Sequence, residues 1–331
     1  MQNLGEELLG LSKEDLSLLS AIETGMKTHE WVPSFVVSEL SGLPDPKVQF
    51  RLGQLFEKKL VEREKMHYLG YRIDFAAYDL LALSDFVKKE KISAFGEKIG
   101  VGKEAVVYEA LGAGRLAVKF HRQGRTSFKH IRRLRDHLEG KPRVPWLYSA
   151  ALAARREFSV MEKLYPAVSV PRPVARSRHA LVMELVEGPA LNRITLSDPE
   201  NALELILGEV AAALKLGIIH ADLSEFNIII DDSGPRMIDW PQAVDADHPH
   251  AQQLMDRDLA NVLRFFERKY RIEMPLDRAR QLVREKASEQ AKVQEKVQEK
   301  KTKNGSETRK EMGKEREREM EQENEQEALR S

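Results

Sequence analysis

Short stretches of helical hydrophobic spacing run through the first part of the chain. Apolar side chains recur there every three or four positions, which places them on one buried face of a helix. These stretches cover residues 12–26, 33–40, 45–56 and 75–87. Ser12 and Asp45 suit the N-cap positions of the first and third stretches, and Pro33 and Pro46 suit a first helical turn. The pattern therefore predicts four helices.

A strand pattern separates the third and fourth of these helices. Residues 60–64 and 68–73 alternate apolar and polar positions around a turn at residues 65–67, and this predicts a β-hairpin. Three helices followed by a hairpin are typical of a winged helix-turn-helix domain, which we expect over residues 1–90. The third helix of such a domain commonly meets nucleic acid.

The expected third helix carries two basic residues that face away from its apolar stripe. Lys47 and Arg51 are therefore candidate contacts to nucleic-acid phosphates. Acidic residues such as Glu57 and Glu62 stand nearby, so the patch is not purely basic. The alternative interpretation is a protein-binding winged helix whose charges are ordinary solvated surface groups.

From residue 91 the pattern changes to strands around a glycine turn. Residues 95–99, 106–110 and 116–120 predict three strands, and the turn between the first two contains Gly100, Gly102, Lys103 and Glu104. Small residues in such a turn let backbone N–H groups approach phosphates. The third strand includes Lys119, whose amine would bridge the α- and β-phosphates of a nucleotide. A hairpin with an exposed lysine is the alternative.

A lysine held at phosphates needs an acidic partner. Residues 149–164 have helical spacing with Glu157 at the centre, and we assign Glu157 as the ion-pair partner of Lys119, with Glu162 as the second choice.

An apolar strand over residues 181–186 follows this helix. There the carbonyl of Glu184 and the amide of Val186 are expected to pair with the edge of an adenine, with Met183 beside the base. A plain core strand is the alternative.

The densest group of chemically active residues lies in the stretch 215–244. His220, Asp222 and Asn227 have the spacing H-x-D-x-x-x-x-N, which matches the catalytic loop of protein kinases, and Asp239 directly follows the next short strand. Asp222 is spaced as the base that orients an attacking hydroxyl. Asn227 and Asp239 supply oxygen ligands for magnesium. Asp222, Asp239 and Lys119 are thus the candidate catalytic residues, and a buried turn with polar caps is the alternative.

Residues 121–145 form an insertion rich in arginine and lysine. With aromatic residues interleaved, such a segment could follow an RNA backbone, and Arg132, Arg133 and Arg135 are the candidate contacts. Its hydroxyls include Ser127, which we regard as the candidate site of autophosphorylation. A solvated, partly ordered loop is the alternative.

The overall composition narrows the class of protein. The 331 residues suffice for two domains, and 53 basic against 53 acidic side chains give no net polyelectrolyte character. The absence of cysteine rules out disulfides and thiolate zinc sites. No signal-peptide pattern and no membrane-spanning apolar run is visible, so we expect a cytoplasmic protein with no membrane partner.

Residues 281–331 are mostly charged and polar and predict a flexible tail or a solitary exposed helix.

The order of these parts resembles the RIO family of atypical serine protein kinases, in its second, winged-helix (Rio2-type) branch. The resemblance covers residues 4–280. Its telling pieces are residues 21–26, 30–33, 99–105 (IGVGKEA), 119, 125–128, 157–158, 220–227 and 238–242.

This resemblance implies an α+β fold. A winged helix-turn-helix domain would precede a compact bilobal kinase-like domain, with an N-lobe over residues 91–186 and a minimal C-lobe over residues 187–280. It also implies use of ATP with magnesium (or manganese), serine autophosphorylation, and a role in maturing the small ribosomal subunit, with the precursor subunit and its rRNA as partners. Members of the family are also thought to act as ATPases through a phosphate on the metal-binding aspartate, here Asp239. An archaeal setting would suit the absence of longer extensions, and the oligomeric state stays open.

Departures from ordinary protein kinases are informative. Ala105 replaces the third glycine of the loop, Ala221 replaces the arginine of H-R-D, and Trp240 and Pro241 follow Asp239 in place of Phe-Gly. No A-P-E motif follows, so we expect neither an activation loop nor the helices that seat a peptide substrate. Two other functions remain open: an ATP-sensing RNA- or ribosome-binding module without significant turnover, and a small-molecule kinase.

Overall fold

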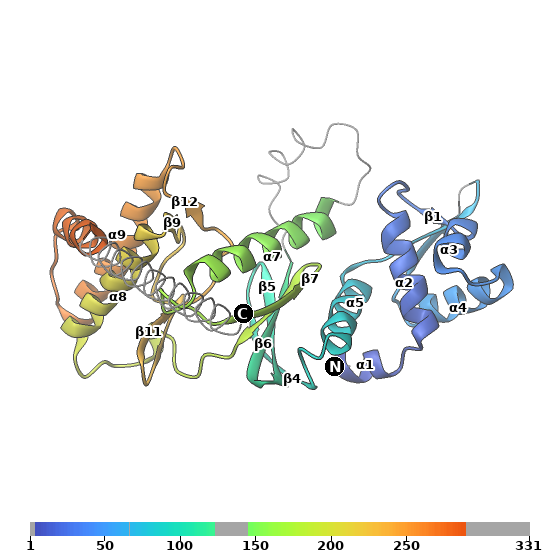
Figure 1. Cartoon of the computed structure of the whole chain (residues 1–331), viewed down its shortest axis with the longest axis horizontal. Helices are drawn as coiled ribbons and strands as arrows, with labels where there is room; N and C mark the ends of the chain where they lie inside the picture. The colour runs from blue at the N-terminus through green and yellow to red at the C-terminus, as the bar shows by residue number, and fades with distance from the viewer. Residues whose placement is uncertain (1–3, 66, 123–144, 289–331) are drawn as a thin grey trace, which may run out of the picture.

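The computed structural model describes residues 4–65, 67–122 and 145–288 (Figure 1). The N-terminal domain lies at one end, a five-stranded sheet occupies the middle, and helices α8 and α9 lie at the other end. The N-terminal elements are α1 (Leu4–Leu9), α2 (Lys13–Gly25), β1 (Val32–Pro33), α3 (Ser34–Ser41), α4 (Asp45–Glu57), β2 (Glu62–Lys65), β3 (Leu69–Arg72) and α5 (Phe75–Lys88). The three strands form an antiparallel sheet in the order β1-β3-β2, which is the expected wing.

Local signals set the helix ends in this domain. Ser12 caps α2 as expected, because its hydroxyl accepts a hydrogen bond from the Asp15 amide (3.1 Å) while the Asp15 carboxylate accepts one from the Ser12 amide (2.9 Å). Two expected starts were off by one residue. Pro33 precedes α3, and Pro44 rather than Asp45 precedes α4, since both prolines hold the extended backbone that a cap residue needs.

Helix α5 belongs to two hydrophobic cores at once. Its first half, with Phe75 and Leu80, packs into the core of the N-terminal domain. Its second half, with Leu83 and Phe86, packs into the core under the five-stranded sheet. The N-terminal domain is therefore joined to the next by a shared buried helix.

The central sheet is antiparallel, with the strand order β4-β5-β6-β8-β7. Its strands are β4 (Ala94–Val101), β5 (Ala105–Gly112), β6 (Gly114–His121), β7 (Pro173–Ser177) and β8 (Ala180–Glu184), and α7 (Pro145–Leu164) packs against β6, β7 and β8. Together they form the expected N-lobe. The N-terminal end of α7, through Leu147 and Ala150, also reaches the core of the N-terminal domain.

The C-lobe is small and mostly helical. Its elements are η1 (Leu191–Arg193), α8 (Pro199–Lys215), β9 (Ile218–Ile219), β10 (Ile228–Asp231), β11 (Gly234–Met237), β12 (Val244–Asp245) and α9 (Ala251–Tyr270). Gly188 lies where the chain passes from the N-lobe to the C-lobe. It has φ +153°, and a Cβ there would lie 2.2 Å from the Ile230 carbonyl oxygen, so only glycine fits.

The C-lobe extends further than we expected. Residues 276–288 are helical, and Ala279 and Val283 are fully buried in the C-lobe core. The sequence-based boundary at residue 280 was therefore too early. The rest of the predicted tail, and within the insertion Ser127, Arg132, Arg133 and Arg135, lie outside the described residues.

The described part of the C-lobe bears on two other expectations. After Asp239 a short connection containing β12 leads to α9, without the extra helices of peptide-binding kinases. None of the helices in residues 4–288 that the structure describes is both long enough and apolar enough to span a bilayer.

An arginine joins the N-terminal domain to the five-stranded sheet through ion pairs. Arg178 lies in the β7–β8 turn with φ +52°. Its guanidinium donates to both carboxylate oxygens of Glu23 on α2 (3.0 Å each from Nε) and to Asp85 on α5 (2.7 Å). Only 15 % of the Arg178 side chain is exposed, so solvent screens these contacts weakly.

We expect Arg178→Gln to lower the free energy of unfolding by about 3 kcal/mol, because it leaves two acids without their shared cation in a part-buried interface. Urea denaturation monitored by circular dichroism measures this. The matched control is Arg115→Gln, which removes an arginine that also pairs with two acids, Glu109 and Glu187, but whose side chain is half exposed. That loss should be much smaller than the loss in Arg178→Gln, because solvent screens the exposed charges. Equal losses would show that Arg178 contributes no more than a surface ion pair.

Candidate functional site

Three side chains that are far apart in the sequence meet between the lobes. Lys119 Nζ of β6 lies 2.6 Å from Glu157 Oε1 of α7 and 2.5 Å from Asp239 Oδ1, which follows β11. Burial lowers the pKa of Lys119, but the charges of Glu157 and Asp239 outweigh it and leave the pKa above its ordinary value. The amine is therefore charged, and the expected pairing of Lys119 with Glu157 is present, whereas Glu162 takes no part in it.

Glu157 is fully buried and binds partners with both of its oxygens. Oε1 accepts from the backbone amide of Trp240 (3.1 Å) as well as from Lys119, and Oε2 lies 2.7 Å from His121 Nε2. Burial alone would raise the pKa of Glu157. The charge of Lys119 and the contact with His121 outweigh burial and lower the pKa to about 2. A permanently charged carboxylate thus ties the N-lobe to the strand end that carries Asp239. The contacts of Trp240 and His121 were not anticipated from the sequence.

The residues of the predicted catalytic loop lie on the connection between β9 and β10. Asp222 is exposed, and the Asn227 side-chain amide donates to the Asp222 carbonyl (2.9 Å). Burial raises the pKa of the Asp222 carboxyl, and the charge of Asp239 raises it further. Ala221 and Asp239 have φ of +61° and +67°, the left-handed region that costs non-glycine residues energy. Such strain is typical of functional turns.

Side chains of helix α9 bind the backbone of this loop. The sequence analysis did not predict these contacts. The buried Asp258 carboxylate accepts hydrogen bonds from the backbone amides of Ala221 (2.7 Å) and Leu223 (3.0 Å). Burial is the main reason why its pKa is raised to about 6. Arg257 donates to the Ala221 carbonyl, and Asn261 to the Leu223 carbonyl. A signal was present, because Asp258 lies on the apolar stripe of an otherwise amphipathic helix.

His220 has a structural task. Its ring packs against Trp240 with centroids 4.3 Å apart, and Nε2 lies 3.0 Å from the Ile238 carbonyl oxygen. Burial lowers its pKa to about 4. The ring is therefore neutral at physiological pH, and Nε2 must carry the proton that the carbonyl accepts.

The glycine turn lies between β4 and β5 as predicted. The Gly102 amide donates to the Ala105 carbonyl (2.8 Å), which closes the turn, and Gly100 is in β4. Lys103 is exposed, while the Glu104 carboxylate accepts a 3.4 Å hydrogen bond from Gln242, beyond Asp239. The loop thereby reaches the C-lobe side of the site.

The other expected nucleotide contacts lie where β8 leaves the sheet. Met183 is half-buried against the C-lobe core. The Glu184 side chain is engaged with Arg236 (3.1 Å), and Val186 follows the end of the strand. The structure thus gathers these residues at the junction of the lobes, and their contact with an adenine stays a prediction.

Asn227 and Asp239 fit a hard cation. The Ile238 amide donates to the Asn227 carbonyl (3.0 Å), which places Asn227 beside the residue that precedes Asp239. The Asn227 amide nitrogen is committed to Asp222, which leaves Oδ1 as its ligand atom. Magnesium needs only one or two such protein ligands together with phosphates and water. Within the described residues, no three His, Cys, Asp or Glu side chains gather closely enough to hold a metal by themselves.

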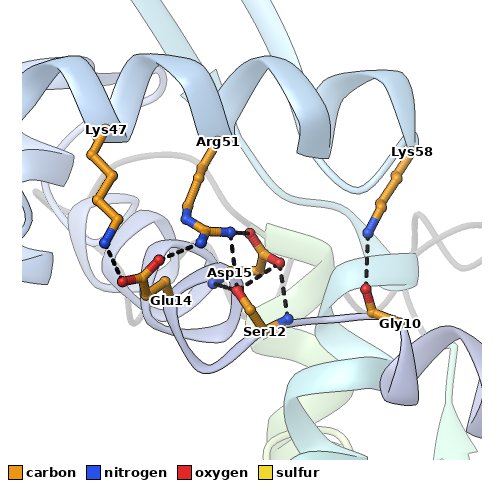
Figure 2. A network of polar contacts seen from close by, with 7 residues as sticks. All are labelled: Gly10, Ser12, Glu14, Asp15, Lys47, Arg51 and Lys58. Carbon is orange, nitrogen blue, oxygen red and sulfur yellow. Dashed lines mark hydrogen bonds and ion pairs between the residues drawn. The ribbon is translucent and has the colours of Figure 1, made fainter.

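The two basic residues proposed for nucleic acid on α4 are already paired (Figure 2). Arg51 contacts Glu14 and donates to Asp15 (3.1 Å) and Ser12 (3.1 Å), and Lys47 contacts Glu14. The acids of α2 thus neutralise the cations of α4. Contact of Lys47 and Arg51 with phosphates stays a prediction, but it would require these ion pairs to open.

The neutral state of His220 predicts how stability depends on pH. Between pH 6.5 and 4 the unfolded chain binds a proton on this histidine and the folded protein does not, so stability falls as pH falls. His179, whose pKa burial lowers to about 4, adds to the same slope, while Asp258 opposes it below pH 6.

A variant isolates the His220 contribution. His220→Gln keeps a donor for Ile238 but does not titrate. The difference in unfolding free energy between wild type and this variant should rise by up to about 3 kcal/mol from pH 4 to pH 6.5. Urea denaturation at several pH values measures it, and a difference independent of pH would show that His220 titrates alike in both states.

Comparison with known proteins identifies the family of both domains. Residues 106–279 match the RIO domain, and residues 8–89 match the N-terminal domain of Rio2. The chain is 42 % identical to the RIO-type serine/threonine-protein kinase Rio2 of Methanocaldococcus jannaschii, over 75 % of this chain and 94 % of that protein. It is 35 % identical to the serine/threonine-protein kinase rio2 of Schizosaccharomyces pombe, over 78 % of this chain and 77 % of that protein.

A solved structure is similar along most of its length. The Rio2 kinase of Chaetomium thermophilum, crystallised as an ADP/Mg²⁺-phosphoaspartate complex, superposes with a TM-score of 0.72 at 32 % identity, covering 85 % of this chain and 88 % of that one. The two family models match both domains in this order, and the chain belongs to the Rio2 branch of the RIO-type serine/threonine-protein kinases.

Proposed function

We propose that this kinase binds ATP with Mg²⁺ between its lobes and transfers or hydrolyses the γ-phosphoryl group there. The observation that carries the proposal is the convergence of Lys119 Nζ on Glu157 Oε1 (2.6 Å) and Asp239 Oδ1 (2.5 Å). An amine from the upper lobe and a carboxylate from the lower lobe thus already stand beside each other.

The residues of the chain divide the work. Lys119, fixed by Glu157, binds phosphate oxygens, and Asp222 accepts the proton of the attacking hydroxyl or water. The raised pKa of Asp222 makes it a better base than a fully solvated aspartate. Asn227 and Asp239 hold the cation, whose charge would neutralise the phosphate oxygens when bound.

Asp239 has a second proposed role as a phosphate acceptor. In this step a carboxylate oxygen of Asp239 attacks the γ-phosphorus, the bond to the ADP oxygen breaks, and ADP leaves. Water then attacks the acyl phosphate, releases phosphate and restores the carboxylate, so the net reaction is ATP hydrolysis. The similar Rio2 kinase of Chaetomium thermophilum was crystallised with phosphoaspartate. The exposed position of Asp239 supports the same chemistry here, since 43 % of its side chain is accessible.

The biological setting is part of the proposal. We infer serine autophosphorylation, with Ser127 as the candidate acceptor, and a cytoplasmic role in maturing the small ribosomal subunit through contact with its precursor and rRNA. The names of the similar proteins support serine phosphorylation, since both are called serine/threonine-protein kinases. The alternative is an RNA-binding module that senses ATP without turning it over, and the discriminating measurement is turnover.

Two substitutions test the assigned chemistry. Asp222→Asn should reduce ATP hydrolysis at least about a hundredfold while nucleotide binding persists, because it removes the base and keeps the size of the side chain. Asp239→Ala should instead lose Mg²⁺-dependent ADP binding, since it removes a ligand of the cation. Phosphate release and calorimetric titration measure these quantities.

Asp232→Asn is the matched control for these variants. This aspartate is exposed in the β10–β11 turn, away from the Lys119 cluster. Its substitution should leave both quantities unchanged. Undiminished turnover in Asp222→Asn would refute its role as base, and undetectable turnover in the wild type with ribosomal precursors present would favour the sensing module.

A second pair of variants locates RNA contact. If the insertion binds rRNA, replacing Arg132, Arg133 and Arg135 by Gln should weaken binding to an rRNA fragment and reduce the salt slope by about 2, as expected for three lost phosphate contacts on a single strand. Replacing Lys47 and Arg51 by Gln should have little effect, because Glu14 and Asp15 already neutralise them. Fluorescence anisotropy at several salt concentrations separates the two, and the reverse result would place the contact on α4.

A further inference from the structure

A buried aspartate of the N-terminal domain binds two residues at the edge of the catalytic framework. Asp79 lies in the second turn of α5, with 7 % of its side chain exposed. Its Oδ1 lies 2.7 Å from His179 Nε2, and its Oδ2 lies 2.5 Å from Arg122 Nη2. Burial lowers the pKa of His179 to about 4, so the ring is neutral and donates its Nε2 proton to the carboxylate.

The surrounding rings keep this cluster rigid. Tyr78 of α5 stacks on His179 with centroids 4.5 Å apart and an interplanar angle of 16°. The Arg122 guanidinium lies over the rings of Phe75 (4.9 Å) and Phe120 (5.6 Å). Asp79 is thus held on a helix that is packed into two hydrophobic cores. A displacement of this helix would therefore displace Arg122 and His179 as well.

Both partners of Asp79 hold backbone that frames the nucleotide site. The His179 carbonyl accepts from the His121 amide (2.9 Å), and the Arg122 amide donates to the Glu104 carbonyl in the glycine turn (2.7 Å). Asp79 therefore fixes the end of β6 from two sides, and through Arg122 it also reaches the turn that is expected to cover the phosphates.

The end of β6 is where the critical ion pair is set. Lys119 and His121 are two positions apart on this strand and so face the same side of the sheet. Lys119 contacts one oxygen of Glu157 (2.6 Å) and His121 lies at the other (2.7 Å). A shift of this strand end moves both partners of Glu157 together.

We propose that Asp79 is a positioning residue for the Lys119–Glu157 pair, acting through Arg122 and His179. The N-terminal domain thereby sets the geometry with which the kinase domain binds nucleotide. The inference rests on the proposed function in one respect, since it assumes that Lys119 binds phosphates. The RIO domain match begins at residue 106, so Asp79 belongs to the other matched domain and acts on the site from outside.

The test uses the full chain and measures calorimetric binding of ADP in excess Mg²⁺, together with kcat/KM for ATP hydrolysis. Asp79→Asn removes the charge that Arg122 and His179 share. We expect about tenfold weaker ADP binding and at least about a tenfold lower kcat/KM, because the ion pair loses its fixed position. Arg122→Gln, whose side chain is partly exposed and whose loss the fold should survive, is expected to act in the same direction.

A double-mutant cycle separates positioning from general destabilisation. If Asp79 acts through Glu157, Asp79→Asn should change ADP affinity less than about twofold when Glu157→Gln is already present, because coupled residues are not additive. Equal effects of Asp79→Asn in both backgrounds would overturn the proposal. So would wild-type affinity in both Asp79→Asn and Arg122→Gln.

The matched control is Glu23→Gln. It removes an acid that links the N-terminal domain to the same β7–β8 turn, through Arg178 rather than His179. It should change ADP affinity and kcat/KM less than about twofold, as expected for a contact that does not reach Glu157. A loss as large as that of Asp79→Asn would mean that any loosening of the domains has this effect, which contradicts a specific role. If the wild type does not hydrolyse ATP, the proposed function fails, and the binding cycle with ADP still decides this inference.

Discussion

One buried amine determines how the two lobes of this kinase meet. Lys119 is 4 % exposed, and a lysine buried to that extent is costly unless acids surround it. Glu157 satisfies it from α7 and Asp239 from the end of β11. Because Glu157 also accepts from the Trp240 amide, the same carboxylate joins the helix, the sheet and the C-lobe. The lobes cannot separate far without breaking the contacts of Lys119 with Asp239 and of Glu157 with the Trp240 amide.

The catalytic loop depends on support from the opposite side. Ala221 and Asp239 adopt a backbone conformation that is unfavourable for residues with a side chain. Asp258 compensates at Ala221 by accepting two backbone hydrogen bonds from the loop. A minimal C-lobe can therefore position Asp222 with a single long helix, α9, beneath it.

The N-terminal domain is built into the kinase domain. Helix α5 contributes to both hydrophobic cores, and the N-terminal end of α7 reaches the first of them. The helix that carries Glu157 thus touches the winged-helix core at its other end. Polar contacts follow the same path, from Glu23 and Asp85 to Arg178 and from Asp79 to His179. Of these contacts, those of Asp79 lead to the end of β6 that carries Lys119, because His179 accepts from the His121 amide.

Sequence alone determined the features that depend on neighbouring residues. The hydrophobic period indicated the helices and the wing, Ser12 indicated a cap, and the spacing of Asp222 and Asn227 indicated a candidate catalytic loop. The order of the glycine turn, Lys119, Glu157 and Asp239 indicated the family. Apart from that order, each of these signals is carried by a short stretch of neighbouring residues.

Only the tertiary structure decided which charges are neutralised and which residues support the site. Lys47 and Arg51 are candidate phosphate contacts by sequence, and only the packing of α2 shows that its acids pair with them. Asp79 and Asp258 belong to no recognised motif, and only the fold shows that they are buried against His179 and against the loop amides of Ala221 and Leu223. The C-lobe continues past residue 280 because Val283 packs into its core. The charged residues around Val283 in the sequence gave no indication of this contact. These outcomes depend on pairs of residues distant in the chain, and a side chain's charge has no fixed meaning until its spatial partner is known.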